Sequence, residues 1–592
     1  MCPVFSCNCR NFASKLHLIR SARFLGITLL FLSFVVFKLC GQASALSIPQ
    51  AADTPIMKGR VCPQMFGAVG DGKSDDTAAF LSMTAFCNQN PGTCVDIPSG
   101  HYVLLKPLVF TENVVIRGDG TNTLLDFSRI ADSRDAAITI TGRYQELEGL
   151  KTPHKAGEST FQYHMSSLLS TGDIIAVLDP RDYSWNRERS YFRKGEFCEI
   201  LASGRTSAEL VDPLNDDYGM GCRLLLMDMV QCEITGICIR VLDRGGIINM
   251  VPLRLCNARN SLVRDVKAEG SNNAQIEIKS SRNVLLDHIC ADYICAENSG
   301  NSYGVMIANS EFIHVTNSTL RALRHGMAIG GGAEGACVIN RHITVNNSTI
   351  SSYITTGADI HGNSQFVAYQ ACEIFNGIDF AGSDITVNNC NFYTSTRKLW
   401  AVSFNLADGT ATIKGNHFYI PEYDRSNLSD YLFSVELPKA ENSIAHGIIC
   451  IENNIFEGCG DHALQINAAG RENRLKLVMK DNVVNGGVSI ENIYESIFEG
   501  NSITASCHFR DAGNAACNST NAIHIHNNVF SGIIQNNIQI CVPHSPGAVA
   551  VIRGNTFPGT ADQAVNIEKA DQTTVIEKDN VFLAGSNELG LE

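Results

Sequence analysis

Short runs of alternating apolar and polar residues recur along most of this chain, and each run is closed by a polar turn. From about residue 236 onward they read RNVLLDHICAD, EFIHVTNSTLRA, RHITVNNSTISS, SDITVNNCNFY and ESIFEGNSITA. Each phrase is an apolar strand, an Asn- or Ser-rich turn and a second strand, and the phrase recurs at roughly 20–30 residues. This unit predicts one rung of a parallel β-helix, with successive rungs about 4.8 Å apart.

The pattern therefore predicts an all-β solenoid over residues 233–592, including a C-terminal cap. Stacked Ile and Val side chains would form its core, and Asn side chains at the turns would hydrogen-bond along the stack. Such a stack needs covered ends, because terminal rungs expose apolar surface and unpaired strand edges. TAAFLSMTAFCNQ, residues 77–89, has apolar residues at helical spacing and follows Asp75 and Asp76, so we expect a capping helix here. Residues 46–149 would comprise this cap and the first rungs.

Two segments depart from the rung pattern. Between residues 150 and 232 the sequence reads as strands of a small β insertion. At the N-terminus, basic residues precede the apolar run 24–37, and small residues follow up to Ala45. This order predicts a signal peptide over residues 1–45 with cleavage near Ala45, and hence a secreted or extracytoplasmic protein without a membrane segment. An uncleaved signal anchor is the alternative.

Charge and cysteine content narrow the functional classes. The 592 residues carry a formal net charge of −14, which argues against a nucleic-acid partner because phosphate binding needs clustered Lys and Arg. Cys87 and Cys94 flank a short polar loop, as do Cys507 and Cys517, so each pair is placed to close a disulfide ring in an exported protein. The alternative is that the cysteines are buried thiols. Their spacing matches no zinc pattern, and no metal site is predicted.

One stretch resembles a known family. QMFGAVGDGKSDDTAAF, residues 64–80, is similar to the opening motif of the pectate-lyase-like superfamily, which includes polygalacturonases, rhamnogalacturonases and phage tailspikes. The resemblance extends in repeat style over essentially all of the mature chain. It implies a right-handed parallel β-helix with an N-terminal capping helix, and an acidic or complex polysaccharide bound on an outer face. It leaves the reaction open, since function belongs to the site and not to the fold.

A second stretch, HGMAIGGG at residues 325–332, resembles the Gly-His-Gly segment of polygalacturonases. The rung in which that family has paired catalytic aspartates reads NSYGVMIANS here, without a carboxylate. Of the family's residues, only His325 carries over.

The candidate site follows from aligning the rungs on one apolar column: Ile278, Ile307, Ile329, Ile360 and Phe380. Because neighbours along a strand point to the opposite face, the residues on either side point outward. The column before reads Glu277, Met306, Ala328, Asp359 and Asp379, and the column after reads Lys279, Ala308, Gly330, His361 and Ala381. The small residues predict an open trough edged by acidic and imidazole side chains, with Arg324 and His325 in the turn beside it.

Two carboxyl groups about 5 Å apart, as Asp359 and Asp379 would be on adjacent rungs, suit the acid and the nucleophile of a retaining glycosidase. Their repulsion would also separate their pKa values and make one group a proton donor. His361 lies on the same face as Asp359 and is an alternative general base, since its ordinary pKa is near neutrality.

The same residues also suit β-elimination on a uronate polymer. His361 or His325 would take the C5 proton, and Arg324, Lys279 or a bound cation such as Ca²⁺ would stabilise the developing charge. Glu277 and Asn363, the latter within GADIHGNS at 357–364, complete the predicted substrate-binding set. The sequence thus predicts a secreted enzyme that cleaves a polysaccharide by hydrolysis or β-elimination. A non-catalytic adhesion solenoid and a uronate C5-epimerase remain the alternatives.

Overall fold

The computed structural model describes residues 59–583, except for 131–134, 164–168, 183–191, 242–248, 293–301, 333–334, 394–401, 407–408, 420–432, 437–444, 458–462, 468–472, 512–519, 533–536, 543–544, 546, 561–563 and 570–571. The predicted signal peptide, residues 1–45, lies outside the described residues. No helix in the described part of the chain is long and apolar enough to cross a membrane.

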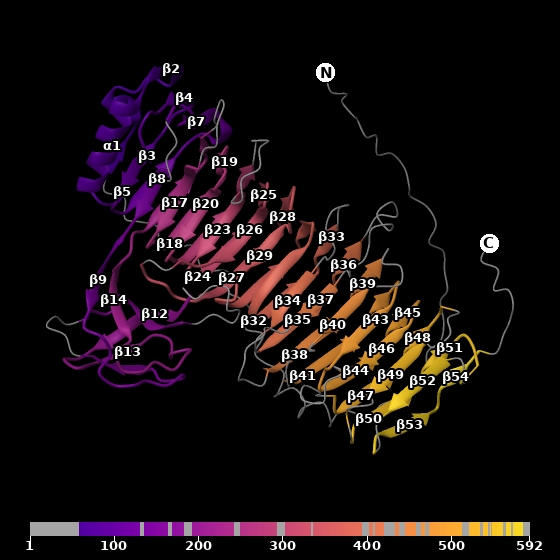
Figure 1. Cartoon of the computed structure of the whole chain (residues 1–592). Helices are drawn as coiled ribbons and strands as arrows, with labels where there is room; N and C mark the ends of the chain where they lie inside the picture. The colour runs from indigo at the N-terminus through magenta and orange to yellow at the C-terminus, as the bar shows by residue number, and fades with distance from the viewer. Residues whose placement is uncertain are drawn as a thin grey trace, which may run out of the picture. The chain divides into compact units, whose positions relative to one another are not determined.

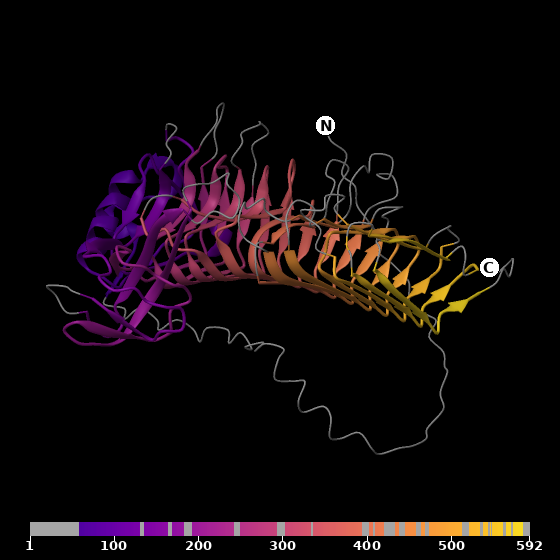
Figure 2. The ribbon, with the colours of Figure 1, turned by 60° about the horizontal axis from the view of Figure 1, so that its bottom comes forward.

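The described chain forms a right-handed parallel β-helix, as expected. Each rung contributes strands to three parallel sheets in the order A, B, C, and equivalent strands of successive rungs lie side by side (Figures 1 and 2). Apolar residues that alternate along these strands point inward and form one continuous core.

Sheet A consists of β1 (Gly59–Val61), β3 (Thr93–Asp96), β6 (Val114–Arg117), β15 (Cys232–Thr235), β18 (Arg259–Arg264), β21 (Arg282–Asp287), β24 (Glu311–Thr316), β27 (Asn340–Asn346), β30 (Ser364–Gln370), β35 (Thr410–Lys414), β38 (Ala445–Glu452), β41 (Asn473–Lys480), β44 (Glu495–Glu499), β47 (Ala522–His526), β50 (Val549–Arg553) and β53 (Thr574–Lys578).

Sheet B consists of β2 (Asp71–Asp75), β4 (Gly100–Val103), β7 (Thr123–Asp126), β16 (Cys238–Arg240), β19 (Lys267–Glu269), β22 (Cys290–Asp292), β25 (Thr319–Ala322), β28 (Thr349–Ser352), β31 (Glu373–Phe375), β33 (Asn391–Tyr393), β36 (His417–Tyr419), β39 (Ile455–Glu457), β42 (Val483–Val484), β45 (Ser502–Ile503), β48 (Val529–Phe530), β51 (Thr556–Phe557) and β54 (Val581–Phe582).

Sheet C consists of β5 (Leu108–Phe110), β8 (Ala136–Thr141), β17 (Val251–Cys256), β20 (Ala274–Lys279), β23 (Tyr303–Ala308), β26 (His325–Gly330), β29 (Ala358–Ile360), β34 (Val402–Leu406), β37 (Phe433–Glu436), β40 (Leu464–Asn467), β43 (Val488–Glu491), β46 (Cys507–Arg510), β49 (Ile538–Val542) and β52 (Val565–Lys569), and the long strand β32 (Ile378–Asn388) continues from sheet C into sheet A.

The turn between sheets A and B repeats one conformation in rung after rung. Its first residue is left-handed, with φ of 54° at Asn453 and 53° at Asp481, and is Asn, Asp or Gly in most rungs because these residues tolerate that region best. The following side chain points inward and forms a ladder whose members are Asn416, Asn454, Asn482, Asn501, Asn528, Asn555 and Asn580.

The side-chain amides of the ladder both donate and accept hydrogen bonds. Asn482 Nδ2 donates to the Ile451 carbonyl at 2.8 Å, and its Oδ1 accepts the main-chain N–H and the Nδ2 of Asn454 at 2.9 and 3.0 Å. The predicted hydrogen bonding of turn asparagines along the stack is thereby confirmed. In earlier rungs Ser or Cys occupies the ladder position. Cys390 is the last of these residues, and its main-chain N–H donates to Asn416 Oδ1 at 2.8 Å.

A helix covers the first rungs at the predicted residues. It is α1 (Thr77–Gln89), preceded by the 3₁₀ turn η2 (Pro63–Phe66); a second 3₁₀ turn is η3 (Gly120–Asn122). Asp75 Oδ1 accepts the Thr77 N–H at the start of α1, and the buried side chains Phe80 and Met83 join the core. The helix therefore shields apolar rung surface at this end of the stack.

An antiparallel sheet interrupts the rungs after β8 (Figure 1). Its spatial order is β10-β13-β12-β11-β14-β9. Its strands are β9 (Arg143–Leu147), β10 (Thr160–Gln162), β11 (Ile174–Asp182), β12 (Arg193–Ser203), β13 (Ser207–Leu210) and β14 (Arg223–Asp228). We call this the inserted sheet. Its first strand, β9, pairs with β14 and so belongs to this sheet, although it lies before the expected position 150. The domain boundaries themselves stay predictions.

One of the two disulfide rings expected from the sequence is not formed. Cys87 and Cys94 are both buried free thiols, so the short ring predicted for them is not formed. Cys87 packs into the core from α1, whereas Cys94 Sγ lies 3.7 Å from Asp96 Oδ1 on β3. Cys507 is buried as well, and Cys517, its expected partner, lies outside the described residues.

The ladder leads to a stability prediction. Asn482→Ala should lower the free energy of unfolding by about 2–4 kcal/mol, because it leaves the N–H groups of Asn454 and the Ile451 carbonyl without partners in the core. The exposed Asn485, from the same rung, provides the matched control variant Asn485→Ala. Urea unfolding measures both, and equal losses would show that the ladder adds nothing specific.

Candidate functional site

The outward columns of sheet C are placed as the sequence alignment predicts. Ile278, Ile307, Ile329, Ile360 and Phe380 are register partners on five successive rungs. In the column before them, Ala328 pairs with Asp359, and Asp359 pairs with Asp379. The alignment is thereby confirmed, and it brings two carboxylates onto adjacent strands, which lie about 4.8 Å apart.

Asp359 is held by an imidazole through one carboxylate oxygen and leaves the other open. Its Oδ2 accepts a hydrogen bond from His361 Nε2 at 3.0 Å and lies 3.5 Å from His325 Nε2. Its Oδ1 has no hydrogen-bond partner among the described residues and is not buried, and 17% of the side chain is exposed. Burial opposes the charge, but the His361 hydrogen bond and nearby positive charge hold the pKa of Asp359 below its ordinary value. Asp359 is therefore an ionised carboxylate.

His325 lies deeper, with 4% of its side chain exposed. Its Nδ1 is 2.8 Å from the Thr356 carbonyl oxygen and donates to it, so the lone pair of the neutral ring is on Nε2. Burial lowers the pKa of His325 to about 4, more than the neighbouring Asp359 raises it. The ring stacks on Tyr303 at a centroid distance of 5.9 Å, and Arg324 Nη1 donates to the Tyr303 hydroxyl at 3.3 Å.

His361 covers the small residues beside it. A Cβ added to Gly330 would lie 2.6 Å from His361 Nδ1, so the imidazole rests directly on this glycine. Ala308 and Ala328 are also buried, at 1% and 5% exposure. The expected open trough is therefore wrong, because all three small residues are buried and the His361 side chain lies on Gly330 instead of standing at its edge. His361 Nδ1 is buried without a hydrogen-bond partner.

The remaining predicted residues differ in their contacts and in their distance from the carboxylate pair. Asp379 Oδ2 accepts a hydrogen bond from Thr356 Oγ1 at 3.3 Å. Glu277 is ion-paired with Arg254 of the preceding rung. Lys279 is half-buried in the His361 column, two rungs from Gly330.

Asn363 is 1% exposed, and its Nδ2 lies 3.4 Å from the Gly330 carbonyl oxygen, which it donates to. The predicted roles of these residues in substrate binding stay predictions. In the described part of the chain no group of three or more His, Cys, Asp or Glu side chains is placed to hold a metal ion.

Two family models match different parts of the chain. One described as Gp49, pectin lyase-like, matches residues 269–507, and one described as rhamnogalacturonase A/epimerase, pectate lyase-like, matches residues 64–158. The chain belongs to the pectin lyase-like superfamily of parallel β-helix proteins. None of the curated protein sequences compared with the chain matches it.

Solved members of the pectin lyase-like superfamily with similar folds include phage tailspikes. Tailspike gp61 of Pseudomonas phage phi297 is 18% identical, with a TM-score of 0.61 and 82% of each chain covered. Tailspike gp49 of Pseudomonas phage LKA1 is 19% identical, with a TM-score of 0.58 and coverage of 87% of this chain and 84% of that one. Tailspike Gp54 of Acinetobacter baumannii bacteriophage AP22, solved in complex with A. baumannii capsular saccharide, is 17% identical, with a TM-score of 0.58 and coverage of 86% and 79%.

Sequence reasoning missed three contributors to this site. Tyr303 is the register partner of His325 and would have followed from extending the alignment toward the start of each strand. Thr356 lies in the turn before β29 and bonds to both His325 and Asp379. Phe192, directly before β12 of the inserted sheet, packs against His361 at a ring-centroid distance of 6.1 Å. Nothing in its local sequence indicates this contact.

The buried histidine predicts a pH dependence of stability. Between pH 6.5 and about pH 4 the unfolded chain binds a proton at His325 that the folded protein does not, so stability falls as the pH decreases through this window. The contribution lost by pH 4 is about 3 kcal/mol. His325→Gln should flatten this part of the curve of unfolding free energy against pH. An unchanged curve would mean that His325 titrates normally.

The packing of His361 on Gly330 gives a second prediction. Gly330→Ala should lower the free energy of unfolding by about 1–3 kcal/mol, because the new Cβ would lie 2.6 Å from an imidazole that also packs against Phe192. Gly332→Ala is the matched control, since a Cβ there meets nothing within 4 Å. Thermal unfolding of both variants measures the difference, and similar melting temperatures would contradict the packing described.

Proposed function

We propose that this protein is a polysaccharide hydrolase whose catalytic groups are Asp359 and Asp379. The observation that carries the proposal is the register pairing of the two aspartates on adjacent strands of sheet C. Strands at about 4.8 Å bring two carboxyl groups to the separation of about 5–5.5 Å typical of retaining glycosidases. In such enzymes one carboxylate attacks the anomeric carbon and the other protonates the leaving oxygen.

The surroundings of Asp359 support its role as the nucleophile. It is ionised, and one oxygen is held by His361 while Oδ1 is open. A fixed carboxylate with one open oxygen is oriented for attack and needs little rearrangement. Asp379 is then the acid, and its hydrogen bond from Thr356 orients it. In this assignment His361 holds the Asp359 carboxylate, and its role as a general base is the alternative.

Hydrolysis fits the two imidazoles better than β-elimination or C5-epimerisation. Both alternatives need a base with an exposed lone pair at the C5 proton of a uronate. His361 uses Nε2 on Asp359, and its Nδ1 is buried. His325 is 4% exposed. Neither ring presents a lone pair to solvent.

Two observations support a polysaccharide as the substrate: the side chains next to the aspartates and a solved structure of similar fold. Tyr303 stacks on His325, which lies 3.5 Å from Asp359, and the Arg324 guanidinium lies over the Tyr303 ring at 5.8 Å from its centroid. Such pairs of an aromatic ring and a cation suit sugar rings that carry acidic groups. A tailspike of similar fold was solved with a capsular saccharide. We therefore expect an acidic polysaccharide, and secretion of the enzyme remains part of the proposal.

The test is cleavage of a panel of uronate-containing and neutral polysaccharides by the purified protein. New reducing ends without ultraviolet absorbance from an unsaturated product are expected, because hydrolysis forms no double bond. Asp359→Asn and Asp379→Asn should each lower the rate by about 10²–10⁴-fold. Glu495→Gln, which removes a surface ion pair with Lys476 on sheet A, should leave it unchanged.

The outcomes separate the alternatives. Rising absorbance would overturn hydrolysis in favour of elimination. Binding without any cleavage across the panel would overturn catalysis and favour a carbohydrate-binding solenoid. Cleavage that survives both aspartate substitutions would move the catalytic site elsewhere.

A further inference from the structure

The inserted sheet docks on the rungs that precede the two aspartates, at the segment between β26 and β27 and at β27 itself. Its strands β11, β12 and β14 contribute apolar side chains to a small second core. This core also contains Ala336 and Val338 from the segment between β26 and β27. The contact therefore joins the inserted sheet to the part of the chain that immediately follows Gly330.

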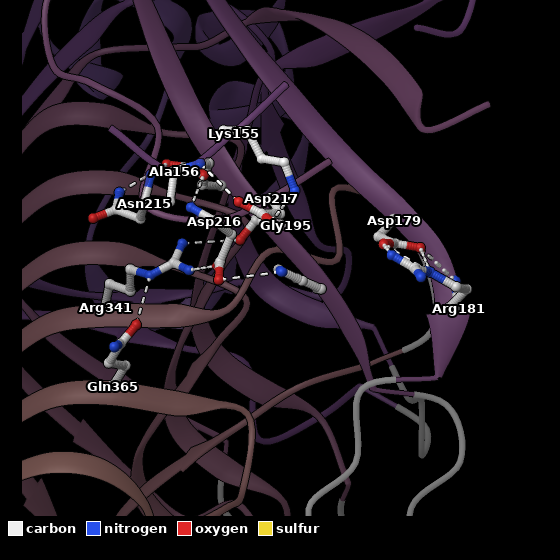
Figure 3. Close-up of polar contacts among 12 residues, drawn as sticks. Lys155, Ala156, Asp179, Arg181, Gly195, Asn215, Asp216, Asp217, Arg341 and Gln365 are labelled. Atoms are coloured by element: carbon white, nitrogen blue, oxygen red, sulfur yellow. Dashed lines mark hydrogen bonds and ion pairs between the residues drawn. The ribbon is translucent and has the colours of Figure 1, made fainter. Parts of the chain in front are cut away.

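A buried arginine fixes this contact. Arg341 on β27 is 1% exposed, and its guanidinium reaches into the inserted sheet (Figure 3). Nη1 donates to the Gly195 carbonyl at 3.1 Å, and Nη2 is paired with Asp216. Nε donates to Gln365 of the next rung at 3.2 Å. A planar guanidinium that uses all its edges in this way fixes orientation better than an ammonium group would.

The backbone approaches closely at the same place. The Gly195 carbonyl also accepts the Ile339 N–H at 3.0 Å. A Cβ on Gly195 would lie 2.8 Å from the Val177 carbonyl oxygen and 3.3 Å from Val338 Cα. A side chain at position 195 would clash with β11 and press on Val338, so glycine suits the close packing of β12 against the segment before β27.

Three residues before Gly195, the chain reaches the catalytic centre. Phe192 is 1% exposed and its ring packs against His361. The same imidazole rests on Gly330 and donates Nε2–H to Asp359. Gly330 and Phe192 together restrict the His361 ring, and the ring in turn orients the Asp359 carboxylate.

We propose that the inserted sheet positions the catalytic groups. Phe192 is the residue that keeps the His361 ring on Asp359. Arg341 is the residue that fixes the inserted sheet to the rungs and so places Phe192. The proposal rests on the hydrolase function proposed above. Phe192 is 1% exposed and its ring packs against His361, so its loss should change the orientation of Asp359 more than substrate binding. We expect a lower kcat with a nearly unchanged KM.

The experiment compares Phe192→Ala, Arg341→Gln and their double variant with Lys155→Gln. Lys155 pairs with Asp217 of another loop of the inserted sheet, and both side chains are exposed, so its variant is the matched control (Figure 3). Carbethoxylation of His361, quantified by peptide mass spectrometry, reports on its shielding without any need for activity. The half-exposed His417, which lies on sheet B, is the internal reference.

Phe192→Ala and Arg341→Gln should both increase labelling of His361 and lower kcat by about 10- to 100-fold. The double variant should be no worse than Phe192→Ala alone, because the arginine acts through the phenylalanine. Lys155→Gln should change neither quantity.

Unchanged labelling of His361 in Phe192→Ala would overturn the proposal, and so would increased labelling with unchanged kcat. Additive losses in the double variant would overturn the role of Arg341. If the wild-type protein cleaves no polysaccharide, the hydrolase function fails by itself, and the labelling result still decides whether Phe192 and Arg341 position His361. Should Arg341→Gln fail to fold, Phe192→Ala carries the test alone.

Discussion

The in-register stacking of rungs is the constraint on which every other feature of this protein depends. From β15 onward, a left-handed residue in each turn lets the chain leave sheet A and enter sheet B at the same angle, rung after rung. The inward ladder side chain then bonds to the rung on each side, so a rung that slipped by one residue would lose these hydrogen bonds. Because the register is fixed, side chains far apart in sequence form straight columns on the outer face of sheet C.

The proposed catalytic centre uses this regularity and adds one irregular part. The columns alone place Asp359 beside Asp379, and they place the floor of small residues next to both. They do not hold the carboxylate in one orientation. That task falls to His361 and, through it, to the inserted sheet, whose position depends on the buried Arg341. Repetition thus supplies the separation of the two acids, while a contact between distant segments supplies their orientation.

The repeat and the columns could be predicted from sequence because they depend on local periodicity. Ile and Phe at equivalent positions identified the register of five rungs, and the apolar spacing over 77–89 identified the capping helix. The trough was not predictable, because the rotamer of His361 decides whether Gly330 is open or covered. The contact of Phe192 with His361 was also beyond reach, since no pattern within the inserted sheet indicates which rung it docks on.

The central claim is that Asp359 attacks the sugar and Asp379 protonates the leaving oxygen. Trapping the intermediate tests it most directly: the protein is mixed with its substrate, quenched rapidly with acid and digested, and the peptides are examined by mass spectrometry. With a substrate whose leaving group departs without protonation, such as a glycosyl fluoride of the same sugar, the account predicts a glycosyl adduct on the peptide that contains Asp359. The adduct should be enriched in Asp379→Asn, because only the second step then needs the missing carboxyl group. An adduct on a different carboxylate, or products of inverted configuration without any adduct, would contradict it.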